Sequence, residues 1–262
     1  MKRLILLSAL LIFAFSYGQT PITDSNLSQA IETCLSTNNS DGMCSDSEYG
    51  AMPNWDVSNV TDMEYIFIGW DEFNADISAW DVSSVTNMED MFKDAIYFNQ
   101  PIGDWDVSSV TDMEGMFQGS AFNQPIGDWD VSNVTDMEDM FANNPGFNAD
   151  ISAWDVSSVT DMKFMFHMAY SFNQPIGDWD VSNVTDMQLM FYNAESFNQP
   201  IGDWDVSNVT DMYGMFSQGG VVFVFNQDIS NWAVDNVIQC TNFSDNTPQW
   251  TLPQPNFTNC TP

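Results

Sequence analysis

Basic residues are almost absent from this sequence of 262 residues. It contains four lysines and arginines against 37 aspartates and glutamates, which gives a formal net charge of −33. Binding to nucleic acid or to anionic lipid depends on cationic side chains that displace counterions, so we expect neither as a partner. The charge instead suits cations, basic proteins or a medium of high salt.

The residues that enzymes commonly use are also scarce. His167 is the only histidine, so the sequence contains no repeated base and no histidine cluster for a metal. Carboxylate pairs are abundant, but a glycosidase needs one special pair in a cleft whose pKa values are pushed apart. Here every pair resembles its neighbours. We therefore predict that the protein is not an enzyme and has no catalytic residues.

Cysteine is rare and confined to the two ends of the sequence. Cys34 and Cys44 precede the central region, and Cys240 and Cys260 follow it. In an oxidising compartment the simplest arrangement is two local disulfides, Cys34–Cys44 and Cys240–Cys260. The alternative is a four-thiolate metal site, which would require the two ends to meet.

The first 18 residues read as a secretory signal peptide. They contain Lys2 and Arg3, an apolar run of roughly a dozen residues, and small residues at Ser16 and Gly18. The apolar run is too short for a membrane span, so we expect no transmembrane segment in the mature chain. Loss of the two basic residues changes the formal charge from −33 to −35. We predict export, to the extracellular medium or the cell surface, with the periplasm as the alternative.

A nearly identical phrase recurs throughout the central region. Trp-Asp-Val-Ser is repeated seven times, and a degenerate eighth copy follows it; successive tryptophans are 24 to 28 residues apart. A fixed period of this size is typical of a solenoid. The tryptophans are Trp55, Trp80, Trp105, Trp129, Trp154, Trp179, Trp204 and Trp232.

Each repeat predicts a short strand followed by one or two helical turns. In residues 102–108, Trp105 and Val107 alternate with polar residues, as in a half-buried strand. Further on, apolar residues at Met113, Met116 and Phe117 have the spacing of a helical stripe. A possible capping box precedes this stripe, formed by Thr111 and Glu114. Stacked repeats would then form one parallel sheet, with the apolar residues between the strands and the helical turns.

The ends differ from the repeats and predict four regions. These are a signal peptide at 1–18, an N-terminal cap at 19–51, an array of about seven repeats plus the degenerate eighth at 52–232, and a C-terminal cap at 233–262. In the N-terminal cap, Leu27, Ile31 and Cys34 would share one helix face, after Asp24 or Ser25 as the N-cap residue.

The phrases "WDVSNVTDMEDMF" and "FNQPIGDWDVSNVTDM" resemble the repeats of BspA-like bacterial surface proteins, a divergent branch of the leucine-rich-repeat class. The resemblance covers about residues 52–232. It implies a leucine-rich-repeat-like solenoid with short parallel strands on one face, short helical turns on the other, and capped ends. It also implies a bacterial extracellular array used for adhesion or protein binding, and no catalytic residues.

Stacking would align repeated aspartates into an acidic face. Two unit charges about 5 Å apart in water repel by only about 0.8 kcal/mol, so such a face is tolerable. It could simply keep the rod soluble, bind an extracellular protein or glycan, or bind calcium through four carboxylates at Asp104, Asp106, Asp128 and Asp130. The candidate binding residues are Asp56, Asp81, Asp104, Asp106, Asp128, Asp130, Asp155, Asp178, Asp180, Asp203 and Asp205.

Other repeated residues are better explained by structure than by binding. Methionines can bind copper and exposed tryptophans can stack on sugars, but their spacing places both in the core. The asparagine that follows phenylalanine in every repeat is expected to form a ladder that bonds backbone groups between repeats. An ice-binding surface made by the repeated threonines is a further alternative, although helix capping would occupy them. Adhesion to a protein or glycan is the function we expect, with a calcium-binding acidic solenoid as the alternative.

Overall fold

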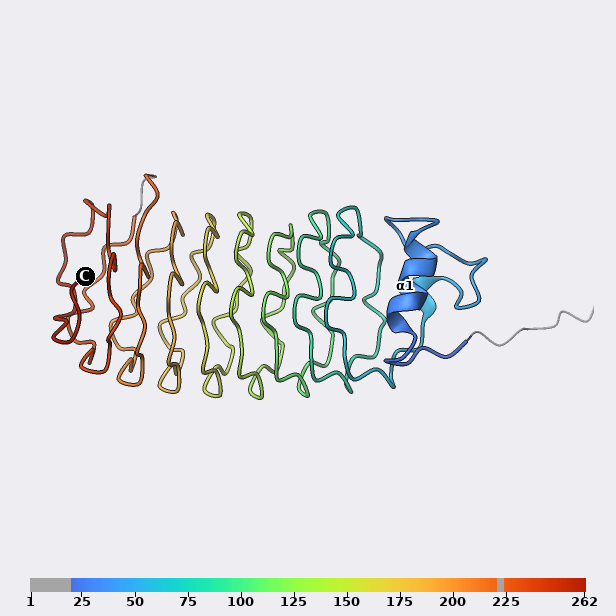
Figure 1. Cartoon of the computed structure of the whole chain (residues 1–262), viewed down its shortest axis with the longest axis horizontal. Coiled ribbons are helices and arrows are strands. Elements are labelled where there is room, and N and C mark those ends of the chain that lie inside the picture. Colours follow the sequence, from blue (N-terminus) through green and yellow to red (C-terminus); the bar gives the residue numbers. More distant parts are fainter. Residues whose placement is uncertain (1–19, 221–223) are drawn as a thin grey trace, which may run out of the picture.

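The computed structural model describes residues 20–220 and 224–262, and it shows a rod of stacked coils (Figure 1). The chain winds from an N-terminal helix, α1 (Leu27–Leu35), at one end of the rod to the C-terminal residues at the other. Within the described residues, the only other helix is a short 3-10 helix, η1 (Met52–Asn54). Each repeat makes one turn of the coil, which we call a rung. The predicted signal peptide lies outside the described residues.

The predicted leucine-rich-repeat-like architecture is wrong. The described part of the chain contains no sheet, and its repeats contain no α-helix. Its β pairing consists of isolated parallel bridges that join one residue of each rung to the next. These bridges connect in series Asp62, Asn87, Asp112, Asp136, Asp161, Asp186, Asp211 and Gln239.

Left-handed residues prevent the predicted helical turns. In the third rung, Gly115 and Gly119 have φ angles of +58° and +67°. A right-handed helix cannot continue through such residues, and non-glycine residues adopt this conformation only at a cost. All eight rungs have the first of these two left-handed positions. Non-glycine residues with positive φ are Tyr65, Asp90, Asp94, Asp139, Asn143, Phe164, Met168, Leu189, Asn193, Asn242 and Asn246.

The same segment forms a ladder in which turn bonds alternate with bonds between rungs. The Met116 N–H donates to the Met113 carbonyl at 3.2 Å, which closes a tight turn within the rung. The Gly115 N–H donates instead to the Glu138 carbonyl of the next rung at 2.7 Å, and the Phe117 N–H donates to Met140 at 3.0 Å. Every second amide is therefore satisfied by the neighbouring rung, which leaves neither a helix nor an extended strand.

The predicted capping box is also wrong. Thr111 lies in no helix; its N–H and its Oγ1 both donate to the Thr86 carbonyl of the preceding rung, at 2.9 and 3.2 Å. The Glu114 N–H is bound at 3.0 Å by Oδ1 of Asp112, two residues before it. The aspartate therefore forms the local turn, while the threonine joins two rungs.

Side chains join the rungs in the segment that was predicted to be a strand. The Trp105 N–H donates to the Ile102 carbonyl at 3.1 Å, so this segment also turns. The indole N–H of Trp129 donates to that same Ile102 carbonyl from the next rung at 3.2 Å. The predicted asparagine ladder is confirmed: Asn99, for example, donates its N–H to Oδ1 of Asn74 at 3.0 Å.

The core consists of stacked columns, as predicted for the tryptophans and methionines. All seven tryptophans of the complete repeats are 3–4% exposed, and the methionines of the first methionine column are fully buried. Phenylalanine rings stack along the rod: Phe92 and Phe117, in successive rungs, have centroids 5.6 Å apart and planes 5° from parallel. Burial of these columns supplies the main stabilising free energy, because a single rung cannot cover its own apolar residues.

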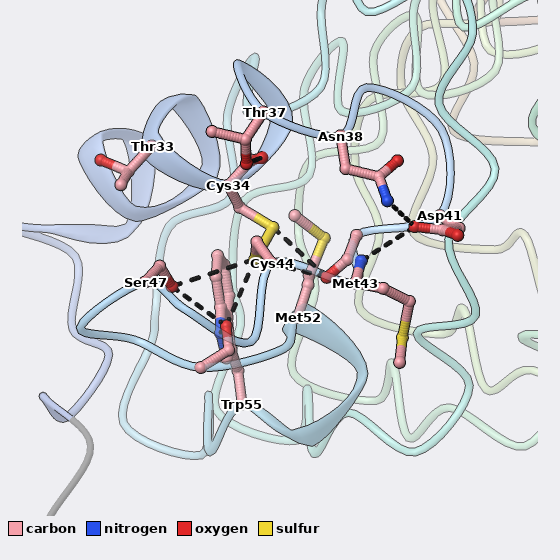
Figure 2. Close-up of a disulfide and its surroundings, with 12 residues drawn as sticks. Thr33, Cys34, Thr37, Asn38, Asp41, Met43, Cys44, Ser47, Met52 and Trp55 are labelled. Atoms are coloured by element: carbon pink, nitrogen blue, oxygen red, sulfur yellow. Dashed lines mark hydrogen bonds between the residues drawn. A yellow bond between two sulfur atoms is a disulfide. The ribbon is translucent and has the colours of Figure 1, made fainter. Parts of the chain in front are cut away.

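Both predicted disulfides are confirmed. Cys34, on α1, is bonded to Cys44, and Met52 and Trp55 of the first rung lie nearby in Figure 2. Cys240 is bonded to Cys260 at the other end of the rod. The predicted N-cap residue is wrong, since Asn26 occupies that position. Asp24 instead accepts bonds from the Thr61 N–H and hydroxyl, which attaches the N-terminal cap to the array. The domain boundaries stay predictions.

The left-handed turns can be tested by changing Gly115 to alanine. In a helix this change would stabilise the protein by up to about 1 kcal/mol. We expect it to destabilise the protein by roughly 1–3 kcal/mol, because φ is +58° and the added Cβ would collide with the Asp90 carboxylate. Urea unfolding measures the difference.

Gly69→Ala is the matched control. Gly69 is also left-handed, with φ of +75°, but its added Cβ would have no neighbour within 4 Å. This variant should show only the smaller cost of the conformation, about 1 kcal/mol. Stabilisation by Gly115→Ala would restore the helical interpretation.

The column packing predicts a large loss of stability for Trp129→Ala. Trp129 is 3% exposed, and its ring stacks on Trp154 with centroids 6.5 Å apart. We expect the free energy of unfolding to fall by about 3–5 kcal/mol, as for other buried aromatic residues. The control, Asn133→Ser, should change it by less than about 0.5 kcal/mol, because equivalent bonds to the preceding rung are made by Asn133 and by Ser109. Comparable losses in both variants would contradict the packing argument.

Candidate binding surface

The predicted aspartate column consists of exposed residues with local hydrogen bonds. In every complete repeat, the aspartate after tryptophan accepts a bond from the backbone N–H of the serine two residues on. Asp106, for example, accepts from the Ser108 N–H at 3.1 Å and from its hydroxyl at 2.6 Å. These bonds favour the charged form and hold the pKa of Asp106 below its ordinary value. The column therefore stabilises turns and remains exposed to solvent.

The other predicted carboxylates line a groove. Asp104 and Asp128 lie on it together with Asp150, in a groove of about 700 Å³ whose remaining walls include Pro125 and Ala153. All three aspartates are exposed. Asp178 and Asp203 occupy the equivalent positions in later rungs and are also exposed. The structure thus brings together part of the predicted set, and it adds Asp150.

The groove follows from an alternation between two kinds of rung. Two successive rungs read Gln-Pro-Ile-Gly-Asp-Trp, and the next reads Ala-Asp-Ile-Ser-Ala-Trp. The glycines allow close approach of the next rung: a Cβ on Gly127 would lie 2.7 Å from the Asp150 carbonyl oxygen. In the fifth rung, Ala153 stands at the position that Asp128 has in the fourth, which leaves space beside the carboxylates.

The predicted calcium ligands do not form a recognisable metal site. Within residues 20–220 and 224–262, no group of three or more histidine, cysteine, aspartate or glutamate side chains is placed to hold a metal ion. Asp106 and Asp130 each direct one carboxylate oxygen to a serine, at 2.6 Å from its hydroxyl.

A second acidic column, which the sequence analysis did not single out, lies on the bridge side of the rod. Burial raises the pKa of Asp136 to about 6, and neighbouring carboxylates at Asp161 and Asp112 add to the effect. Burial likewise raises the pKa of Glu114 to about 7 and that of Asp139 to about 6. The Thr-Asp-Met phrase could have identified Asp136 and its equivalents, because it recurs in six of the seven complete repeats.

The two cations of the described residues both lie among these carboxylates. Lys93 pairs with Asp90 at 2.8 Å, and Lys163 pairs with Glu138 in the adjoining part of the surface. Neither Glu114 nor Asp136 forms an ion pair in the described part of the chain. Within these described residues, Glu114 and Asp136 therefore lack an ion pair that would favour their charged forms.

His167, the only histidine of the sequence, lies among aromatic residues. Its ring stacks on Tyr192 with centroids 4.9 Å apart, and burial lowers its pKa. Its Nδ1 is buried and has no hydrogen-bond partner among the described residues. The neutral ring thus forms part of an aromatic cluster with Phe164, whose centroid is 5.3 Å away.

The repeats of this chain match the sequence profile of a family described as "Mycoplasma protein of unknown function, DUF285". The matches cover residues 38–148, 119–223 and 182–257. The chain belongs to this family. Three overlapping matches are what a repeat array is expected to give. No curated protein and no solved structure matches the chain, so the resemblance to BspA-like surface proteins stays an expectation.

The second acidic column predicts that stability rises as the pH falls from 8 to 5.5. The folded protein holds protons on Glu114, Asp136 and Asp139 more tightly than the unfolded chain, whose ordinary values are 4.5 for glutamate and 3.8 for aspartate. Their protonation therefore stabilises the fold, and this contribution is lost as the pH rises through about 6 to 7. The midpoint of urea unfolding, compared between pH 8 and pH 5.5, measures this change in stability.

The control removes two of the titrating groups. Glu114→Gln combined with Asp139→Asn should raise the midpoint at pH 8 and reduce its change with pH. Asp106→Asn should not reduce this change, because the pKa of Asp106 is shifted downward. A midpoint that is higher at pH 8 than at pH 5.5 in the unaltered protein would contradict the account.

Proposed function

We propose that the mature chain is an exported, non-enzymatic binding or adhesion module for a basic extracellular protein. The observation that carries the proposal is the open groove with the carboxylates of Asp104, Asp128 and Asp150 on a chain with a net charge of −33. A groove lined by charges of one sign concentrates and orients a partner of opposite charge. Proline and alanine side chains beside the carboxylates offer apolar contact to the same partner.

Two further observations support export and binding. The disulfides at both ends suit an oxidising compartment. The resemblance of the repeats to BspA-like surface proteins favours adhesion as the biological role. Among the described residues, no helix combines the length and the apolar character that a membrane crossing requires.

A protein partner is favoured over a glycan. Sugar binding commonly uses exposed aromatic rings as stacking platforms, but the tryptophans of the repeats are 3–4% exposed and donate their indole N–H groups to the backbone. The groove itself contains no aromatic residue. Its charge and its mixed polar and apolar walls suit an extended basic peptide.

The groove can be tested with a lysine-rich peptide of nine residues as the probe. The triple variant Asp104→Asn, Asp128→Asn and Asp150→Asn should weaken binding by roughly tenfold or more and reduce its dependence on salt, as titration calorimetry at two salt concentrations would show. Asparagine keeps the size of each side chain, and at position 150 its Oδ1 can still accept the bonds from Ser152.

The matched control carries three equivalent changes in later rungs, Asp178→Asn, Asp203→Asn and Asp228→Asn. It removes the same charge, and Asp228 bonds to Ser230 as Asp150 bonds to Ser152. We expect a clearly smaller loss of affinity. Equal losses in both triple variants would show that binding depends only on total charge and would contradict a role for the groove.

A further inference from the structure

One group of positions differs between rungs although the framework around it is constant. The seven complete repeats share the same tryptophan, aspartate, valine, serine, threonine, methionine and phenylalanine positions. By contrast, the two residues after the first methionine and the two after Met-Phe or Ile-Phe change from rung to rung. They are positions 64, 65, 68 and 69 in the first rung and, in the seventh, 213, 214, 217 and 218. We call them the variable strip.

Backbone bonds align these positions along the rod. The Asp90 N–H donates to the Glu114 carbonyl at 2.7 Å, and the Phe164 N–H donates to the Gln188 carbonyl at 2.9 Å. The second pair of positions is joined in the same way, as by the Met168 N–H and the Tyr192 carbonyl at 2.8 Å. The strip is therefore one continuous band, and stacking does not require its side chains to be alike.

The strip changes character along its length. Its first four rungs carry glutamate at the first position, Glu64, Glu89, Glu114 and Glu138. From the fifth rung onward the first position carries Lys163, Gln188 and Tyr213, and the strip there includes partly exposed aromatic and aliphatic residues. These are Phe164, His167, Met168, Leu189, Tyr192 and Tyr213.

Three of the apolar residues are held in an unfavourable conformation. Phe164, Met168 and Leu189 have φ angles of +57°, +57° and +53°. Apart from Tyr65 in the first rung, the other rungs place glycine, aspartate or asparagine at the left-handed positions, and these residues adopt such angles more easily. A bulky residue there costs about 1–2 kcal/mol. Because these side chains are partly exposed, the core does not require them, and retained strain of this kind is typical of binding sites.

A groove of about 480 Å³ lies at the end of the strip. Its lining includes Leu189, Tyr192 and Tyr213 of the strip, together with Asp245. Gln218, which is 1% exposed, also lines the groove, and its Oε1 has no hydrogen-bond partner within residues 20–220 and 224–262. A buried acceptor without a donor is costly. A ligand that supplied a donor to the Gln218 Oε1 would therefore be stabilised in this groove.

We propose that the variable strip docks a basic protein segment, and that a lysine or arginine side chain of this segment enters the groove between Tyr192, Tyr213 and Asp245. The cation would contact the tyrosine rings and the carboxylate, and its N–H groups would provide the donor that Gln218 lacks. Apolar residues of the segment would cover Phe164 and Leu189, and further basic residues would face the glutamates. This inference rests on the proposed function, and it assigns the selection of the partner to the variable strip.

The test uses a nine-residue peptide of alternating lysine and leucine that carries a photoreactive benzophenone. Crosslinked residues of the intact protein, identified by mass spectrometry, should lie in the variable strip of the fifth to eighth rungs. Phe164→Asn combined with Leu189→Asn should weaken binding roughly tenfold or more, because aromatic and large apolar anchors dominate such interfaces. Asparagine already occupies the equivalent left-handed position at Asn242, so the melting temperature should be retained.

Tyr97→Ser is the control variant. Tyr97 is an aromatic residue that is 61% exposed, but it lies outside the strip. Binding should therefore not change in this variant. Crosslinks confined to the groove at Asp104, Asp128 and Asp150, with unaltered affinity of the strip variant, would overturn this inference and leave the proposed function intact. Absence of saturable binding to the unaltered protein would contradict both.

Discussion

The whole rod depends on hydrogen bonds between successive rungs at left-handed turns. At each such turn, one amide closes the local turn and its neighbour donates to the following rung. In the third rung, the Met116 N–H donates to the Met113 carbonyl, and the Gly115 N–H donates to the Glu138 carbonyl of the next rung. This alternation satisfies the backbone without a helix or a sheet. It also brings the rungs close enough for the phenylalanine and tryptophan rings to stack. The ring centroids of Phe92 and Phe117, for example, are 5.6 Å apart. Backbone bonding and core packing therefore reinforce each other along the rod.

The core could be predicted from the sequence, but the backbone path could not. The spacing of Trp105, Val107, Met113, Met116 and Phe117 identified buried columns, because inward-facing residues must recur in every repeat. The same spacing suggested a strand and a helix, since i, i+3 and i+4 contacts also arise from consecutive tight turns. The evidence against a helix was the residue two after each first methionine. Gly115 and Asp139 are of residue types that adopt left-handed angles readily, which favours a turn at this position. Phe164 and Leu189 are of types that rarely adopt such angles, so they do not indicate the turn.

The candidate surface was predicted in part for a similar reason. Asp104 and Asp128 were identified because they are repeated and acidic, and they line a groove with Asp150. The variable strip could not be recognised from residues that recur, because its side chains differ between rungs. In an array whose framework is fixed by stacking, the exposed residues that differ between rungs are the ones free to adapt to a partner. A column-by-column comparison of the repeats would have found Phe164 and Tyr192 from the sequence alone.

The account depends most directly on the left-handed backbone of the repeats. NMR measurement of the HN–Hα couplings and Cα chemical shifts across residues 137–143 gives φ at each position. The structure predicts positive φ at Asp139 and Asn143, with values of +58° and +54°, separated by right-handed or extended residues. Uninterrupted helical shifts from Met137 to Asn143 would contradict the ladder and, with it, the position of the variable strip.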